Sequence, residues 1–227
     1  CIFCRLRRSL EWTIRCYHEQ QISGGFGSFL TLTFNDQGIK DCGLCLKNGL
    51  LTLDHRPYQL FMKRLRKKLG PVRFLMCGEY GSRTLRPHYH AILFGFRFPD
   101  SRPFGKYFRS SELEQLWPHG YSLIGNLSHN SISYVCRYNL KKVTGKAAEA
   151  YYKGRMPDYV RMSNRPGIGA DWLSRFGGDV YKVDMLTEQV FQDAVRYRGQ
   201  LSRPPRYYDR LQSTIDPALW TIVQQAR

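Results

Sequence analysis

The stretch that decides the fold is RPHYHAILFGF, residues 86–96, where two histidines stand one residue apart before an apolar run. We expect a β-strand over 87–96, because apolar and aromatic residues of this kind favour extended structure. Side chains alternate between the two faces of a strand, so His88 and His90 point to the same face. Two imidazoles side by side on a sheet are unusual unless a ligand needs both.

The segment before it, VRFLMCGE at 72–79, is a second predicted strand, joined to the first by the polar turn YGSRTLR. Antiparallel pairing around the middle of that turn places Glu79 opposite His88 and Cys77 opposite His90. Glu79 and the two histidines then share one face at cross-strand contact distance. The arrangement depends on register, because a slip of one residue turns both histidines to the other face.

Two imidazoles and one carboxylate form an incomplete coordination shell that leaves positions for water and substrate. Mixed nitrogen and oxygen ligands without thiolate suit Mg²⁺ or Mn²⁺, and the same set leaves Zn²⁺, Ni²⁺ and Fe²⁺ open. An open shell favours catalysis in which the ion polarises or orients a phosphoryl oxygen. The alternative is that each ring only forms a hydrogen bond with a neighbouring group.

The segment NSISYVCRYNLKK, residues 130–142, is predicted to be an amphipathic helix. On a helical wheel, Tyr134, Tyr138 and Lys141 fall within about 60° of one another. The opposite half of the wheel carries the apolar residues Ile132, Val135, Cys136, Leu140 and Val143. The helix therefore buries one side and presents two phenols and an ammonium group on the other.

This polar face suggests nucleophilic chemistry on a phosphate. A nearby lysine favours the phenolate form of a tyrosine, or stabilises the charge that develops on the phosphate. With a metal ion at the same phosphate, the combination predicts covalent attack on a phosphodiester and a phosphotyrosyl intermediate. The alternative is a solvated face of tyrosine and lysine that stacks on bases without reacting.

The charge of the chain points to a polyanionic partner. Its 227 residues include 35 Lys and Arg against 18 Asp and Glu, which gives a net charge of +17. Fifteen Tyr and thirteen Phe favour nucleic acid over an anionic membrane or a merely soluble surface, because aromatic rings stack on unpaired bases. No segment approaches the ~20 apolar residues of a membrane span. We expect nucleic acid as the partner and no membrane.

Seven cysteines, an odd number with no secretory signal in view, argue against a full disulfide framework and fit a reducing compartment such as the cytoplasm. CIFC and CGLC both have the spacing of zinc knuckles. One interpretation is a structural zinc held by four thiolates. The other is a pair of unrelated, reduced segments. The cysteines concerned are Cys1, Cys4, Cys42 and Cys45.

Hydrophobic periodicity predicts helices over 5–21, 57–69, 110–117, 131–143 and 216–227, and strands over 28–34, 72–79, 87–96 and 121–125. This order predicts an α+β fold in which an antiparallel sheet carries helices on one side. We expect a core domain at 1–150 that includes the basic N-terminal helix. A basic extension rich in Arg and Tyr, 151–227, is expected to pack on that core, with loops at SNRPGIG and SRPPRYYDR.

The motifs, in this order, resemble those of a known family. PHYHAILFG resembles the histidine–hydrophobic–histidine motif of the HUH endonucleases, and YVCRYNLKK resembles their two-tyrosine motif. FLTLT resembles the first motif of the rolling-circle replication initiators. Together with MCGEYG, RPGIG and PPRYYDR, the set is similar to the replication initiator proteins of microviruses, especially the gokushovirus-like group, over most of the chain.

The resemblance implies the HUH endonuclease fold, a five-stranded antiparallel sheet that bears the metal histidines with the tyrosine helix alongside. It implies a metal-dependent, site-specific single-stranded DNA endonuclease and strand transferase that uses Mg²⁺ or Mn²⁺. Such an enzyme nicks the viral origin of a small circular phage genome and keeps the 5′ phosphate on tyrosine. The free 3′-OH then primes the host replication machinery in the cytoplasm of the bacterial host, and rejoining releases a circular genome.

The resemblance also implies a role for individual residues. Carried over by position, the metal ligands are His88, His90 and, on the register argument, Glu79. The nucleophiles are Tyr134 and Tyr138, with Lys141 as the assisting lysine. The basic residues beside these motifs that we expect to contact DNA are Arg86, Arg137 and Lys142.

Two other classes of function stay open at this point. The first is a non-catalytic module that binds single-stranded DNA or RNA by stacking bases on its aromatic residues. Replacing both tyrosines by Phe separates it from the enzyme, because binding survives either way and cleavage is lost only from an enzyme. The second is an iron oxygenase with two histidines and one carboxylate. The net charge and the tyrosine helix speak against this second class.

Overall fold

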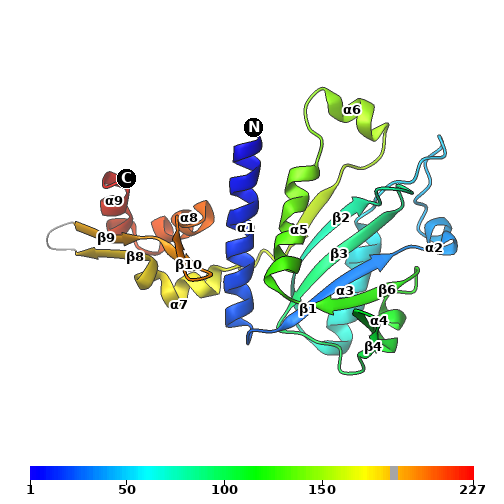
Figure 1. The fold of residues 1–227 in the computed structure, drawn as a ribbon, viewed down its shortest axis with the longest axis horizontal. Coiled ribbons are helices and arrows are strands. Elements are labelled where there is room, and N and C mark those ends of the chain that lie inside the picture. Colours follow the sequence, from blue (N-terminus) through cyan, green and yellow to red (C-terminus); the bar gives the residue numbers. More distant parts are fainter. Residues whose placement is uncertain (185–188) are drawn as a thin grey trace.

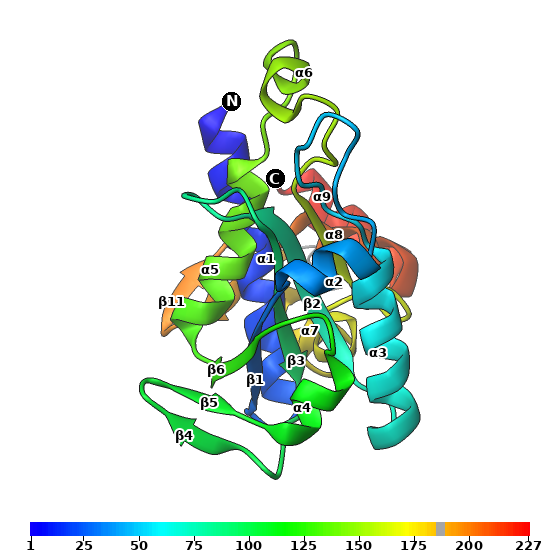
Figure 2. The same ribbon diagram turned by 90° about the vertical axis from the view of Figure 1, so that its right-hand side faces the viewer.

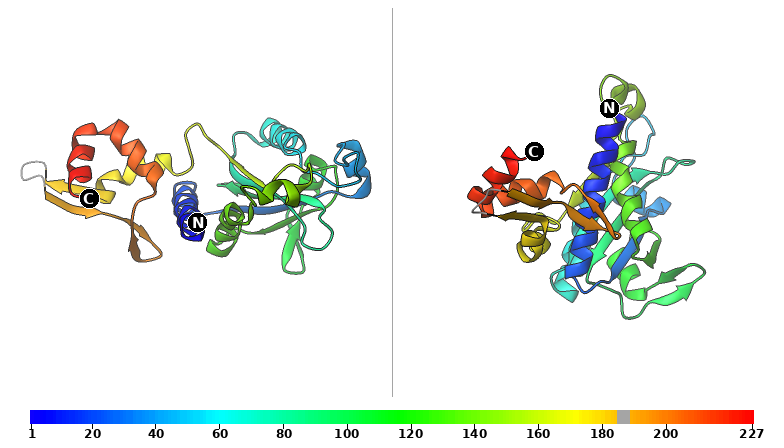
Figure 3. Two further views of the ribbon diagram at one scale, coloured as in Figure 1. Left: turned by 90° about the horizontal axis from the view of Figure 1, so that it is seen from above. Right: turned by 60° about the vertical axis from the view of Figure 1, so that its left-hand side comes forward.

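The chain is described by a computed structural model that covers residues 1–184 and 189–227, without the side chains of 138–141, 184, 189 and 191. A long helix, α1 (Ile2–Ile22), runs through the middle of the molecule. A large antiparallel sheet lies on one side of α1 and a smaller C-terminal lobe lies on the other (Figure 1). The view from above shows the same arrangement (Figure 3).

The sheet has seven strands in the order β4-β5-β6-β1-β3-β2-β7, and every pairing is antiparallel. The strands are β1 (Gly27–Thr33), β2 (Arg73–Tyr80), β3 (Pro87–Phe94), β4 (Arg102–Phe104), β5 (Tyr107–Arg109), β6 (Ser122–Asn126) and β7 (Tyr159–Met162). The expected five-stranded sheet is therefore wrong in its strand count. Part of the difference is the short β4–β5 hairpin, which turns at Gly105 with a φ of +59° inside a segment expected to be mostly loop.

Helices cover both faces of the sheet, which corrects the expectation of helices on one side. Figure 2 shows α3 (Arg56–Leu69) and α5 (His129–Lys141) on opposite sides of it. The reason is visible in β2, where the consecutive residues Leu75, Met76 and Cys77 are all buried. Because consecutive side chains point to opposite faces, such a run needs cover on both. The short helices around this layer are α2 (Asp36–Asp41), α4 (Ser111–Leu116) and α6 (Ala147–Tyr152).

The C-terminal lobe has its own apolar core, which includes Ile14 of α1. Its elements are α7 (Ala170–Val180), β8 (Tyr181–Asp184), β9 (Gln189–Asp193), β10 (Val195–Tyr197), β11 (Gln200–Ser202), α8 (Arg206–Ile215) and α9 (Pro217–Gln225). Part of SRPPRYYDR, expected to be a loop, forms the start of α8. The cap of α9 is as expected, since the Asp216 side chain accepts a hydrogen bond from the Leu219 N–H at 3.0 Å.

The division at residue 150 stays a prediction, and the chain beyond it contributes to both halves of the molecule. Strand β7 lies in the segment 151–227 and pairs with β2, whereas the rest of that segment builds the lobe. None of the described helices is long and apolar enough to cross a membrane.

A buried ion pair fastens α1 to both the sheet and the start of the lobe. Glu19, which is 0% exposed, pairs with the Arg73 guanidinium of β2 and accepts a hydrogen bond from the Gly169 N–H at 2.7 Å. Arg15, one turn earlier, donates to the Ile168 carbonyl oxygen at 3.0 Å. Helix α1 is therefore the common support on which the sheet and the lobe are held in place.

A buried histidine on α1 makes the packing of the lobe sensitive to pH. The His18 ring stacks on Trp172 with centroids 3.6 Å apart, and its Nδ1 lies 2.9 Å from the Tyr208 hydroxyl. The Nε2 lies 3.4 Å from the Arg196 carbonyl oxygen. Burial lowers the pKa of His18 to about 4, against an ordinary value of about 6.5.

We expect the free energy of unfolding to fall as the pH drops from about 6.5 to about 4. In that interval the unfolded chain binds a proton at His18 that the folded chain does not, which costs up to about 3 kcal/mol of stability. Urea unfolding at roughly neutral pH and at about pH 4.5 measures the loss. The His18→Gln variant should lose less stability over the same interval, and an equal loss in the two proteins would contradict the assignment.

Candidate metal and tyrosine site

Strands β2 and β3 pair in the register expected from the sequence. Glu79 lies opposite His88 and Cys77 lies opposite His90. The connecting turn is closed by backbone hydrogen bonds between Gly81 and Arg86, so its length sets the register. The two histidines and the glutamate consequently share one face of the sheet, the face that α5 covers.

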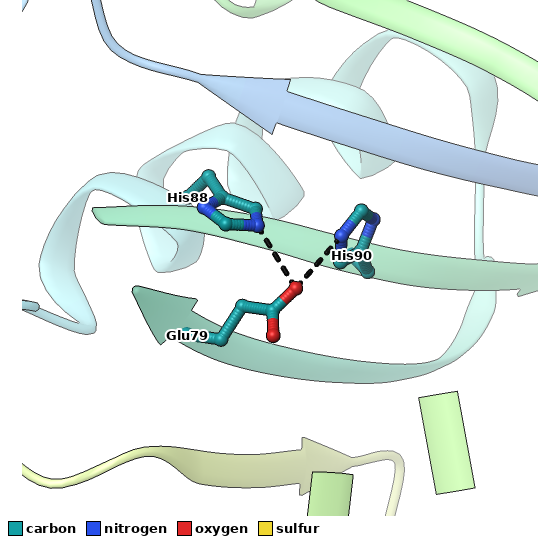
Figure 4. A group of neighbouring side chains, drawn as sticks. All are labelled: Glu79, His88 and His90. Atoms are coloured by element: carbon teal, nitrogen blue, oxygen red, sulfur yellow. Dashed lines mark hydrogen bonds and ion pairs between the residues drawn. The ribbon is translucent and has the colours of Figure 1, made fainter. Parts of the chain in front are cut away.

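The three side chains converge on a single oxygen atom. Oε1 of Glu79 lies 2.9 Å from Nε2 of His88 and 3.0 Å from Nε2 of His90 (Figure 4). Glu79 is 5% exposed and His90 8% exposed. A carboxylate is seldom buried to this degree unless positive charge or hydrogen-bond donors compensate it.

The other ring nitrogens show how the histidines are oriented. Nδ1 of His88 lies 3.2 Å from the Arg86 carbonyl oxygen, which can only accept, so Nδ1 carries the proton. In the neutral ring, Nε2 then has no proton and faces a carboxylate oxygen, which is also an acceptor. Two acceptors at hydrogen-bond distance require a cation or a further proton between them. Nδ1 of His90 lies 3.0 Å from the Thr31 hydroxyl, which fixes that ring as well.

This donor set fits a divalent ion. The ligand atoms of Glu79, His88 and His90 lie within 4.8 Å of one another, and no other group of three or more His, Cys, Asp or Glu does so within the described residues. Adjacent ligands of an octahedral Mg²⁺ ion, with bonds of about 2.1 Å, are about 3.0 Å apart, close to the two oxygen–nitrogen distances above. Held Nδ1 atoms of ligating histidines are a usual feature of metal sites.

Helix α5 brings a tyrosine to the histidines. Ser128 caps the helix by accepting a hydrogen bond from the Ser131 N–H. The apolar side of α5, which includes Ile132, Val135 and Cys136, is fully buried against the sheet and α1. Tyr134 is 37% exposed, and its ring lies edge-on to His90 with centroids 5.2 Å apart. The expected proximity of the imidazole pair and the tyrosine helix is confirmed for this tyrosine.

The backbone of α5 continues through the other two residues of the predicted polar face. Tyr138 lies one turn beyond Tyr134, and Lys141 is the last residue of the helix. The side chains of both lie outside the described residues. Their roles stay predictions from the sequence.

Comparison with known proteins assigns the family. The family model for the replication-associated protein ORF2 matches residues 27–143, from the start of β1 to just beyond α5. The chain belongs to this family. The matched region contains all three metal-site residues and Tyr134. No solved structure matches the chain, so the HUH endonuclease fold stays an interpretation of the sequence.

Three relatives of this replication-associated protein family come from phages. The chain is 32% identical over 240 residues to replication-associated protein VP4 of Bdellovibrio phage phiMH2K, covering 97% of this chain and 68% of that protein. It is 29% identical over 224 residues to replication-associated protein ORF2 of Spiroplasma virus 4, covering 92% and 65%. Identity to replication-associated protein ORF4 of Chlamydia phage 1 is 32% over 158 residues, covering 63% and 37%. The chain thus spans about two thirds of the length of the first two relatives.

The three basic residues predicted to contact DNA have different surroundings in this family member. Arg86 donates to the Phe34 carbonyl oxygen at 3.0 Å and pairs with Asp36 at 2.5 Å, which lowers the pKa of that aspartate. Arg86 therefore links β3 to the chain after β1. Arg137 and Lys142 are exposed, at and just beyond the end of α5. Contact of all three with DNA stays a prediction.

The four cysteines considered as a zinc site are not brought together. Sγ atoms of Cys1 and Cys4 lie 3.3 Å apart at the start of α1. Cys42 and Cys45 follow α2 on the far side of the sheet, where Cys42 lies 3.5 Å from Nδ1 of a histidine, His119. The described side chains therefore form no four-thiolate site.

Sequence reasoning missed two residues that shape the site. Thr31 orients His90 through its hydroxyl, and Phe29 stacks on the His90 ring with centroids 5.4 Å apart. Phe29 also meets Tyr134 edge-on at 6.2 Å. Both lie in FLTLT on β1, where Thr31 is directly opposite His90. The alternation in that segment was the available signal, but it needed knowledge that β1 pairs with β3.

Proposed function

We propose that the chain is a metal-dependent single-stranded DNA endonuclease and strand transferase that initiates rolling-circle replication of a small circular phage genome. The observation that carries the proposal is the Tyr134 ring beside His90, whose Nε2 shares the Glu79 oxygen with His88. Membership of a replication-associated protein family and a net charge of +17 support a DNA substrate. A tyrosine at this place has no evident use in an iron oxygenase.

In this proposal, Glu79, His88 and His90 hold a Mg²⁺ or Mn²⁺ ion. Bound there, the ion would polarise a phosphoryl oxygen of the DNA and help to orient the phosphate. Thr31 and the Arg86 carbonyl keep the two imidazoles in the tautomer and orientation that binding requires. Phe29 packs against both His90 and Tyr134 and so fixes the distance between ligand and nucleophile.

The phenol oxygen of Tyr134 attacks the phosphorus in the proposed first step. A bond forms between this oxygen and phosphorus while the bond from phosphorus to the 3′ oxygen breaks. The phenol loses one proton and the departing 3′ oxygen gains one, so the exchange leaves a phosphotyrosyl 5′ end and a free 3′-OH. The host replication machinery of the bacterial cytoplasm then extends that 3′ end.

The second cut and the rejoining need a second nucleophile or a return of the first. Tyr138 is proposed for this step, since it lies one helical turn beyond Tyr134 on α5. Attack of a 3′-OH on the phosphotyrosyl phosphorus reverses the first step and closes a circle. Lys141 is proposed to stabilise the negative charge that develops in each transfer.

An end-labelling experiment tests the proposal. Single-stranded fragments that tile the genome encoding the chain are labelled at either end and incubated with the protein and Mn²⁺. We expect the 3′-end label to migrate with the protein on a denaturing gel, because that fragment carries the 5′ phosphate at the nick. The 5′-end label should be released as a free fragment, and chelation by EDTA should stop both. Release of both labels as free fragments would contradict covalent catalysis.

A further inference from the structure

A cavity of about 670 Å³ lies between α1, α5 and the β10–β11 hairpin of the lobe. We propose that it binds an unpaired nucleotide of the single-stranded DNA, next to the nucleophile. The proposal rests on the proposed function and adds a nucleotide site to it, partly built by the C-terminal lobe. The size falls within the ~300–1,000 Å³ of ordinary ligand sites.

The lining has the chemistry that a base and its phosphate need. Leu6 and Leu10 of α1, which are 48% and 44% exposed, offer an apolar surface on which a base can lie. Asn130 supplies amide donors and an acceptor for base edges. Arg137 and Arg198 supply positive charge for a phosphate. No Asp or Glu lies among the described residues that line the cavity.

The cavity adjoins the reacting tyrosine along the surface of α5. Asn130 precedes Tyr134 by four residues and Arg137 follows it by three. Residues at these spacings are neighbours on a helix, with Cβ atoms about 5–6 Å apart. A strand with one phosphate at Tyr134 can therefore place a neighbouring nucleotide in the cavity without leaving the helix.

The hairpin that closes the cavity is fixed to α5 by a histidine. Nε2 of His129 contacts the Tyr197 hydroxyl of β10 and lies 3.2 Å from the Ser133 hydroxyl. A serine nucleophile would need an acid on the other nitrogen of the ring, but here both hydroxyls meet the same nitrogen. The contact therefore positions the hairpin, and we assign it no reaction of its own.

The hairpin turn holds an arginine in an uncommon backbone conformation. The two-residue turn is Arg198-Gly199, with φ values of +51° and +77°. Positive φ at both positions matches a type I′ turn, in which asparagine or glycine is the usual first residue. An arginine there costs some stability, and such a cost is commonly found where a residue serves a site.

The positive charge continues away from the tyrosine. Arg198 also lines a second cavity, of about 510 Å³, together with Arg175 and Arg196 of the lobe. Tyr17 lies in the same cavity and meets Tyr197 edge-on at 5.5 Å. Cations interleaved with aromatic rings are typical of surfaces that follow single-stranded DNA.

Binding measured in EDTA tests the nucleotide site separately from cleavage. We expect Leu10→Glu to weaken binding of fluorescent single-stranded DNA by about tenfold or more, because a carboxylate in the cavity repels phosphate. The matched control is Ile215→Glu, which adds the same charge at an exposed position on α8 and should bind as the parent does. Equal affinities for Leu10→Glu and its control would overturn the proposal. That result is also the one expected if a protein segment covers the leucines.

A second variant tests the arginine without disturbing the hairpin. Arg198→Asn creates the Asn-Gly sequence that type I′ turns favour, so the fold should be kept. We expect the slope of log K against log[salt] to become shallower by about 0.7, the value for one phosphate contact on a single strand. Lys67→Gln, which removes one exposed charge from α3 on the other side of the sheet, should leave the slope unchanged. An unchanged slope for Arg198→Asn would overturn the proposal.

A photocrosslink locates the bound base directly. Single-stranded DNA that contains iodouracil is irradiated with the full chain in EDTA, and the joined peptide is sequenced by mass spectrometry. We expect crosslinks at Tyr197 or His129, whose rings border the cavity. Crosslinks confined to other surfaces would overturn the proposal. Failure of the endonuclease proposal would appear differently, as normal crosslinking and binding with no covalent adduct in Mn²⁺.

Discussion

Tyr134→Phe is expected to lower the rate of covalent adduct formation with single-stranded DNA by at least about a thousandfold. The substitution removes the attacking oxygen, and the loss of a nucleophile has effects of this order or larger. The remaining phenyl ring keeps its edge-on contacts with His90 and Phe29, so the fold should not change. Single-turnover cleavage in Mn²⁺, followed on denaturing gels, measures the rate.

Tyr151→Phe is the matched control, because Tyr151 is a half-exposed tyrosine on α6. It should cut DNA as the parent does. Parental cleavage by Tyr134→Phe would show that Tyr134 is not the first nucleophile. Cleavage by the double variant Tyr134→Phe/Tyr138→Phe would remove the phosphotyrosyl mechanism altogether.

Glu79→Gln is expected to weaken Mn²⁺ binding by more than the ~10–100-fold seen when residues behind the ligands are changed. Glutamine keeps the shape of the side chain but removes the charge that both imidazoles face. Cleavage at moderate Mn²⁺ concentration should be lost with it. Isothermal titration calorimetry with Mn²⁺ alone measures the affinity independently of any activity.

The control for this variant is Asp171→Asn, which removes an exposed carboxylate from the first turn of α7. Its Mn²⁺ affinity should equal that of the parent. Equal affinity of Glu79→Gln and the parent would place the metal elsewhere. Thermal unfolding of each variant, without metal, shows whether a loss of binding follows from a loss of fold.

The local geometry of the site could be predicted because short-range rules govern it. A single turn connects β2 to β3, so the alternation of side chains placed Glu79 opposite His88 from sequence alone. The helical repeat likewise placed Tyr134 on the side of α5 away from the apolar residues. In each case the deciding residues lie within about one hairpin or one helix of each other.

The rest depended on long-range packing that no short-range rule fixes. Thr31 and Phe29 reach His90 only because β1, some 60 residues earlier, pairs with β3. Burial of both sheet faces was signalled by the run Leu75-Met76-Cys77, but a short apolar run does not say which helices cover it. The β10–β11 hairpin has strands of three residues, too short for a periodic signal, although Arg198-Gly199 marks its turn.

The same packing explains how the C-terminal lobe can take part in DNA binding. Glu19 ties α1 to the sheet and to the segment before α7, and His18 stacks between residues of the lobe. The hairpin is therefore held beside α5 by several contacts that are remote in sequence. A basic extension that looked like loops becomes one wall of the proposed nucleotide site.

A cation held by the imidazole pair and a phenol on α5 are together proposed to act on one DNA phosphate. Mass spectrometry of the trapped adduct tests this most directly, because trypsin cuts after Arg137 and so separates the two tyrosines. We expect a nucleotide on the peptide 110–137, with fragment ions that place it on Tyr134, and only when Mn²⁺ is present. A nucleotide on Tyr121 of that peptide, on a residue outside α5, or on no residue at all would contradict the proposed mechanism.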